Sequence, residues 1–61
     1  MHTTIRHTAA HEIDAGNVEL GWYMHGVADR AEGLEIDPHQ AFDAEYGVHY
    51  RNGYHGRAFN E

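Results

Sequence analysis

The chain has 61 residues, which allows one small domain, 1–61, and excludes a multidomain enzyme. It has no cysteine, so disulfides, thiolate zinc sites and iron–sulfur clusters are excluded. Ten Asp and Glu residues stand against four arginines, for a formal net charge of −6. A chain of this size buries only about 60 % of its unfolded surface, so we expect an oligomer or a partner to add to its stability.

The negative charge is concentrated in the middle of the sequence. Between Glu12 and Glu45 lie nine carboxylates and only one arginine, Arg30, whereas each flank carries a net charge of +1. Nucleic acids and anionic membranes attract basic segments, so we expect direct binding to neither. Residues 1–4 do not begin a signal peptide, and no apolar run approaches the roughly 20 residues of a transmembrane helix. The sequence therefore predicts a cytoplasmic location.

The first half of the chain predicts a short N-terminal arm over residues 1–9 and a first helix over residues 10–33, which Gly33 ends as a C-cap. Apolar residues recur at helical spacing and form one stripe: Ile13, Leu20, Met24, Val27, Ala31 and Leu34. Three glycines each weaken a continuous helix by about 1 kcal/mol: Gly16, Gly21 and Gly26. A break near Gly16, with the helix proper starting at Asn17, is the alternative.

A second helix is predicted over residues 37–59. Asp37 is a suitable N-cap, Pro38 fits the first helical position, and Gln40 completes a pattern like a capping box. Two helices joined by a short connection predict an all-α fold, a small αα-hairpin with a short N-terminal arm.

The C-terminal part of this second helix has an alternative. Asn52 and Gly53 lie between short runs rich in tyrosine and histidine, a pattern that is also typical of a type I′ β-hairpin. That interpretation gives an α+β fold. The helix is favoured because one helical stripe continues from the capped start: Phe42, Tyr46, His49 and Gly53.

Trp22 lies almost opposite the apolar stripe of the first helix, near Asp14, Asp29 and Glu32. One interpretation is that Trp22 packs under the N-terminal arm or the C-terminal tail. The other is that it anchors an interface, because interface hot spots favour tryptophan, tyrosine and arginine. A second aromatic stripe, spaced by four residues, is interpreted as the edge of the core: Tyr46, Tyr50 and Tyr54.

The sequence offers little support for metal or catalytic chemistry. His7 and His11 are spaced as two ligands on one helix face, with Asp14 as a third. Seven histidines among 61 residues produce such a spacing by chance, so we predict no metal and no cofactor. Paired carboxylates need a sheltered pocket to act as acid and base, and two helices leave little room for one. The sequence therefore predicts no enzyme.

Glycines and aromatic residues recur in a pattern that covers about two thirds of the chain: Trp22, Gly26, Asp29, Arg30 and Gly33, then Asp37 and Pro38, then Tyr50, Gly53, Tyr54, Gly56 and Arg57. It resembles the short helical-hairpin proteins of phages and mobile elements. Within that group, a small acidic chain without lysine or cysteine is similar in size and charge to anti-CRISPR proteins. The resemblance implies that the chain occupies a basic DNA-binding groove on a CRISPR surveillance complex.

The charge pattern predicts a stoichiometric inhibitor, in which carboxylates stand in for phosphates against a basic nucleic-acid-binding protein or complex. The expected partner-binding residues are Asp14, Trp22, Asp29, Glu32, Glu35, Asp37, Asp43 and Glu45. The alternative is a structural or regulatory module that dimerises and binds a protein without imitating DNA. Its dimer face would be formed by Phe42, Tyr46 and Gly53.

Overall fold

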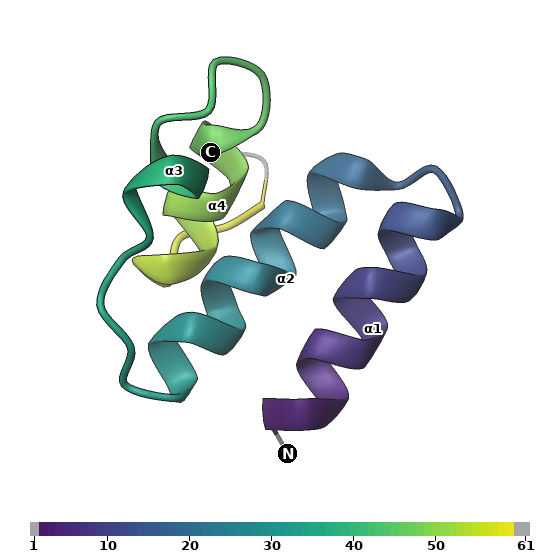
Figure 1. Cartoon of the computed structure of the whole chain (residues 1–61), viewed down its shortest axis with the longest axis horizontal. Coiled ribbons are helices and arrows are strands. Elements are labelled where there is room, and N and C mark those ends of the chain that lie inside the picture. The colour runs from purple at the N-terminus through teal and green to yellow at the C-terminus, as the bar shows by residue number, and fades with distance from the viewer. Residues whose placement is uncertain (1, 60–61) are drawn as a thin grey trace.

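The described part of the chain consists of helices and connections. The computed structural model describes the backbone of residues 2–59 and the side chains of residues 5–59. Its helices are α1 (His2–Asp14), α2 (Val18–Ala31), α3 (Pro38–Ala41) and α4 (Gly47–Tyr54), and residues 2–59 contain no strand (Figure 1). None of these four helices has the length and apolarity needed to cross a bilayer. The predicted all-α fold is confirmed.

The N-terminal residues form a helix and not an extended arm. Residues 2–9 belong to α1, so the arm expected over residues 1–9 is wrong there, and Met1 lies outside the described residues. Local preference is weak here, because a helix this short gains most of its stability from tertiary packing. Ala9 is fully buried, and its carbonyl oxygen lies against Gly21 of α2. Contact with α2 therefore stabilises α1.

Gly16 ends α1 and separates it from α2. Its φ of 94° lies in the left-handed region, its N–H donates to the Ile13 carbonyl at 3.1 Å, and the Asn17 N–H donates to the Glu12 carbonyl at 2.7 Å. These two bonds form a Schellman motif. The continuous helix expected over residues 10–33 is therefore wrong, and the alternative break near Gly16 is confirmed. The same pair of bonds ends α2 at Gly33, as predicted, and α4 at Gly56.

The predicted helix start at Pro38 is confirmed. Asp37 is the N-cap, and its carboxylate accepts the His39 N–H at 2.9 Å and the Gln40 side-chain amide at 2.8 Å. In a capping box Gln40 would bond the N-cap backbone N–H instead. That Asp37 N–H is already occupied, because it donates to the Tyr50 hydroxyl at 3.0 Å.

The second helix expected over residues 37–59 is interrupted, so α3 and α4 are separate. The Asp43 carboxylate accepts the backbone N–H groups of Glu45 and Tyr46 at 2.9 and 2.8 Å. A side chain that bonds its own backbone in this way competes with helix formation. Helix α4 then begins at Gly47, and Asn52 and Gly53 lie inside it, so the alternative β-hairpin is not formed.

Helix α2 lies between α1 and α4, and α3 lies beside α4 (Figure 1). Two glycines of α2 allow both neighbours to approach closely. A Cβ on Gly21 would fall 3.0 Å or less from Ile13 side-chain atoms of α1, and one on Gly26 would collide with the Tyr50 carbonyl oxygen of α4. Gly53 of α4 is in turn pressed against the Tyr23 carbonyl of α2. These glycines therefore weaken the helices locally but permit their close packing.

We predict that Gly26→Ala destabilises the protein, although alanine is the better helix former. The new methyl group would meet backbone atoms of Tyr50 and Tyr54, which cannot rotate away, so α2 and α4 must separate. Overpacking of this kind costs on the order of 2 kcal/mol, which lowers the melting temperature of a domain this small by about 10 °C. Thermal unfolding followed by circular dichroism measures the change. Ala10→Ser, which adds one atom at an exposed site of α1, is the control and should melt within about 2 °C of the wild type.

Candidate functional site

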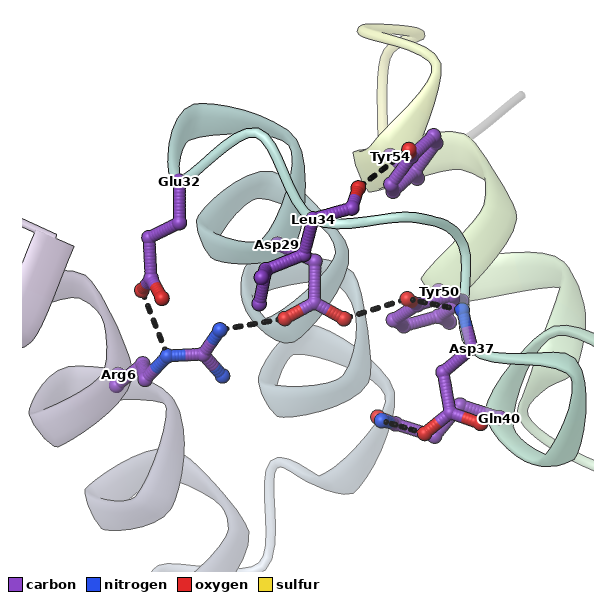
Figure 2. A network of polar contacts seen from close by, with 8 residues as sticks. All are labelled: Arg6, Asp29, Glu32, Leu34, Asp37, Gln40, Tyr50 and Tyr54. Atoms are coloured by element: carbon purple, nitrogen blue, oxygen red, sulfur yellow. Dashed lines mark hydrogen bonds and ion pairs between the residues drawn. The ribbon is translucent and has the colours of Figure 1, made fainter.

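Asp29 is the centre of a polar network that crosses the fold (Figure 2). The residue is only 6 % exposed. Its carboxylate accepts the Arg6 guanidinium of α1 at 2.5 Å through one oxygen and the Tyr50 hydroxyl of α4 at 2.5 Å through the other. Both oxygens are therefore occupied inside the protein, and the expected role of Asp29 in imitating a surface phosphate is wrong.

Two further carboxylates from the predicted site also hold the fold together. Glu32 accepts the Arg6 Nε–H at 2.7 Å, which leaves the guanidinium paired with two acids. Asp37 caps α3, and the hydrogen bond from the Gln40 side chain lowers the pKa of that carboxyl. These residues already have partners within the chain, and we assign them structural roles.

Trp22 comes together with two other predicted residues, Asp43 and Glu45. Its indole ring packs on Tyr46, with ring centroids 5.5 Å apart and an interplanar angle of 33°. It thus packs on the α3–α4 connection, a contact that neither interpretation of Trp22 had predicted. Asp43 and Glu45 precede Tyr46 in the sequence by three residues and by one residue. Together with Glu19 of α2 they form what we call the acidic aromatic face: Glu19, Trp22, Asp43, Glu45 and Tyr46.

The carboxylates of this face act on one hydroxyl group. A hydrogen bond with Glu45 raises the pKa of Tyr46, and the negative charges of Glu45, Glu19 and Asp43 raise it further. Glu19 belongs to α2 and the other two carboxylates to the α3–α4 connection. Their common effect on Tyr46 indicates that carboxylates from two distant parts of the sequence lie near its hydroxyl group, and the Trp22 ring packs beside the same residue.

Two predicted residues lie outside this patch. Asp14, at the end of α1, and Glu35, in the α2–α3 connection, are both exposed. Glu19 is a member of the face that the sequence analysis missed. The signal was available, because Glu19 precedes Trp22 by three residues and such residues share one side of a helix.

The expected dimer face does not exist as one surface. Gly53 is buried against the Tyr23 carbonyl of α2, and Tyr46 is half-buried beside Trp22. Phe42, by contrast, is 78 % exposed. The helical stripe that joined these residues in the sequence is broken between α3 and α4, so Phe42 and Gly53 do not share one helix face.

The histidines form no metal centre in the described residues. His7 and His11 lie one turn apart on α1, but among the side chains of residues 5–59 no three His, Asp or Glu residues are grouped to hold a metal ion. An open groove of about 510 Å³ lies beside Glu19 and is lined by Asn17, Glu19, Leu20, His49 and Phe59. The Nδ1 atom of His49 is buried there without a hydrogen-bond partner, and its ring packs on Phe59.

Comparisons with protein-family models, with curated proteins and with solved structures find no match to this chain. The resemblance to anti-CRISPR proteins therefore stays a prediction. Function has to be argued from the acidic aromatic face itself.

We predict that Tyr50→Phe destabilises the fold more than Tyr54→Phe. Loss of the Tyr50 hydroxyl leaves Asp29 with one donor fewer and the Asp37 N–H without its acceptor, at a cost of about 1–3 kcal/mol. The Tyr54 hydroxyl donates to the Leu34 carbonyl in an exposed part of the chain, where water can replace it, so that change should cost less than about 1 kcal/mol. Urea unfolding of both variants provides the comparison. Equal destabilisation would show that the network contributes nothing beyond an ordinary surface bond.

We predict further that the advantage of wild type over Tyr50→Phe shrinks in alkali. Burial, together with the hydrogen bond to Asp29, raises the pKa of Tyr50 to about 12. The unfolded chain releases this proton near pH 10 and the folded chain only near pH 12, so the stabilisation is complete below pH 10 and is lost between these values. From pH 10 to pH 11 the difference in unfolding free energy should fall by about 1 kcal/mol. If the difference in unfolding free energy between the two proteins did not change with pH, the raised pKa of Tyr50 would be contradicted.

Proposed function

We propose that this protein is a stoichiometric inhibitor that occupies a basic nucleic-acid-binding site on another protein or complex. Its carboxylates take the place of phosphates, in the manner expected of an anti-CRISPR protein, and it acts without a cofactor or catalysis. The observation that carries the proposal is the convergence of Glu19, Asp43 and Glu45 around the Trp22–Tyr46 ring pair. The proposal places the protein in the cytoplasm, where such complexes work.

Three of the four arginines, Arg6, Arg30 and Arg51, interact with groups outside the acidic aromatic face. Arg6 pairs with Asp29 and Glu32, and these are the ion pairs among the residues that the structure describes. The Arg51 guanidinium donates to the Ala41 carbonyl, and Arg30 lies 5.8 Å above the Tyr54 ring. Glu19, Asp43 and Glu45 are left without a cationic partner, so their field is available to a basic surface.

Charge and aromatic rings contribute differently to such binding. An uncompensated negative patch speeds the encounter with a basic surface and fixes the orientation of the complex. Buried aromatic contacts at the centre of the interface then supply most of the affinity. The acidic aromatic face combines both features, whereas Asp14 and Glu35 present only charge.

We predict that the double variant Glu19→Lys/Glu45→Lys loses partner binding by about 100-fold, because each substitution replaces attraction by repulsion. The wild-type chain should capture a nucleic-acid-binding protein from a bacterial lysate at about 50 mM salt and release it at about 500 mM, where charges are strongly screened. Mass spectrometry identifies the captured protein, and a biosensor then measures its affinity for each variant.

The matched control is Asp14→Lys/Glu35→Lys, which changes the net charge equally at exposed positions outside the face. It should weaken binding by less than about 5-fold, because separated surface charges act mainly on the association rate. Both double variants should keep the wild-type circular dichroism spectrum. Binding that ignores salt and both charge reversals would contradict the proposal and favour the protein-interaction module that does not imitate DNA.

A further inference from the structure

Phe42 is an exposed aromatic residue that directly precedes a member of the acidic aromatic face. Its side chain is 78 % exposed, compared with 48 % for Leu34 and 42 % for Val48. It lies directly after α3 and immediately before Asp43, a member of the acidic aromatic face. A large aromatic ring left in water gives up the stabilisation that burial would provide. Of these three exposed apolar residues, Phe42 is the most exposed and the one directly next to a member of the acidic aromatic face in the sequence.

The backbone around Phe42 is fixed before any partner arrives. The Phe42 N–H donates to the Pro38 carbonyl at 3.0 Å, and the carbonyl of the preceding residue, Ala41, accepts the Arg51 guanidinium. On the other side, the Asp43 carbonyl accepts the Gly47 N–H at 3.0 Å. Because the loop is already ordered, binding through Phe42 loses little conformational entropy.

A second exposed apolar residue, Val48, belongs to the segment that packs against this loop. The backbone of Gly47 lies against the Ala41 carbonyl, so closely that a Cβ on Gly47 would come within 3.0 Å of it. Phe42 and Val48 are the residues that follow these two in the chain, and both are exposed. The two exposed apolar residues therefore belong to segments whose backbones lie against each other, the α3–α4 connection and the first turn of α4.

The surrounding charge selects the kind of partner. A second copy of this chain would bring another set of carboxylates against Asp43 and Glu45, and opposed like charges are costly at an interface. A partner surface that has arginine and lysine around an apolar pocket would instead attract this face. Its pocket would bind the Phe42 ring, and its cations would neutralise the carboxylates. Charge complementarity thus favours a basic partner protein over self-association.

We infer that Phe42 is the apolar anchor of the interface and enters a pocket whose rim is formed by arginine and lysine side chains of the partner. The inference rests on the proposed function and adds which residue makes the central contact. Under this inference the interface anchor is Phe42 and not Trp22, which the sequence had suggested for that role. Trp22 is half-buried against Tyr46, so less of its ring is available to a partner than of the Phe42 ring.

The inference is tested with a photoreactive chain in which Phe42 is replaced by p-benzoylphenylalanine. Irradiation in a bacterial lysate should crosslink position 42 to a partner peptide, which mass spectrometry then identifies. The expected peptide combines apolar residues with arginine or lysine and belongs to the nucleic-acid-binding surface of the partner. The matched control carries the same photoreactive group at the exposed position Leu34, in the α2–α3 connection, and should give no such crosslink.

The affinity of Phe42→Ala for the captured partner gives the second measurement. Truncation of a hot-spot aromatic residue weakens binding by about 30-fold or more, whereas Leu34→Ala should weaken it less than about 3-fold. A crosslink to a second copy, equal crosslinking from both positions, or full affinity of Phe42→Ala would overturn the inference. If binding is lost in Glu19→Lys/Glu45→Lys but kept in Phe42→Ala, the proposed function stands and only the anchor is wrong.

Discussion

The buried carboxylate of Asp29 determines how the helices are arranged. It receives Arg6 from α1 and Tyr50 from α4, and Tyr50 accepts the backbone N–H that precedes α3. A buried charge without partners costs several kcal/mol, so only an arrangement that brings both donors to Asp29 is stable. The buried apolar residues in the described part of the chain are three alanines and Tyr50, which provide little apolar area. Directional polar bonds therefore determine the arrangement of the helices, which in a larger protein would be determined mainly by apolar packing.

Small residues make this network possible. The backbones of α2 and α4 touch at Gly26 and Gly53, which brings the Tyr50 ring beside α2 and its hydroxyl to Asp29. Larger residues at these glycines would hold the helices apart and lengthen the bonds to a buried charge. Close packing and charge compensation therefore depend on each other, although one concerns steric contact and the other electrostatics.

Sequence rules succeeded where local chemistry decides the structure. The cap at Asp37 and the helix end at Gly33 were predictable, because each uses a backbone conformation or a hydrogen bond within a few residues. Sequence rules failed where contacts between distant residues decide the local structure. Helix α1 forms through contact with Gly21, and Asn52-Gly53 stays helical because Gly53 packs on Tyr23. In the candidate site, Trp22 was identified from its position opposite the apolar stripe, and Glu19 could have been found from the spacing between them.

The carboxylates themselves were the hardest group to sort, because nothing local distinguishes Asp29 from Glu35. The difference arises only when folding brings Arg6, 23 residues away in sequence, onto Asp29. Folding thereby separates the acids into those that form an ion pair inside the protein and those that form no ion pair among the described residues. Glu19 and Glu45 belong to the second group and can change without disturbing the Asp29 network. A surface with that freedom can adapt to a basic partner while the fold beneath it stays the same.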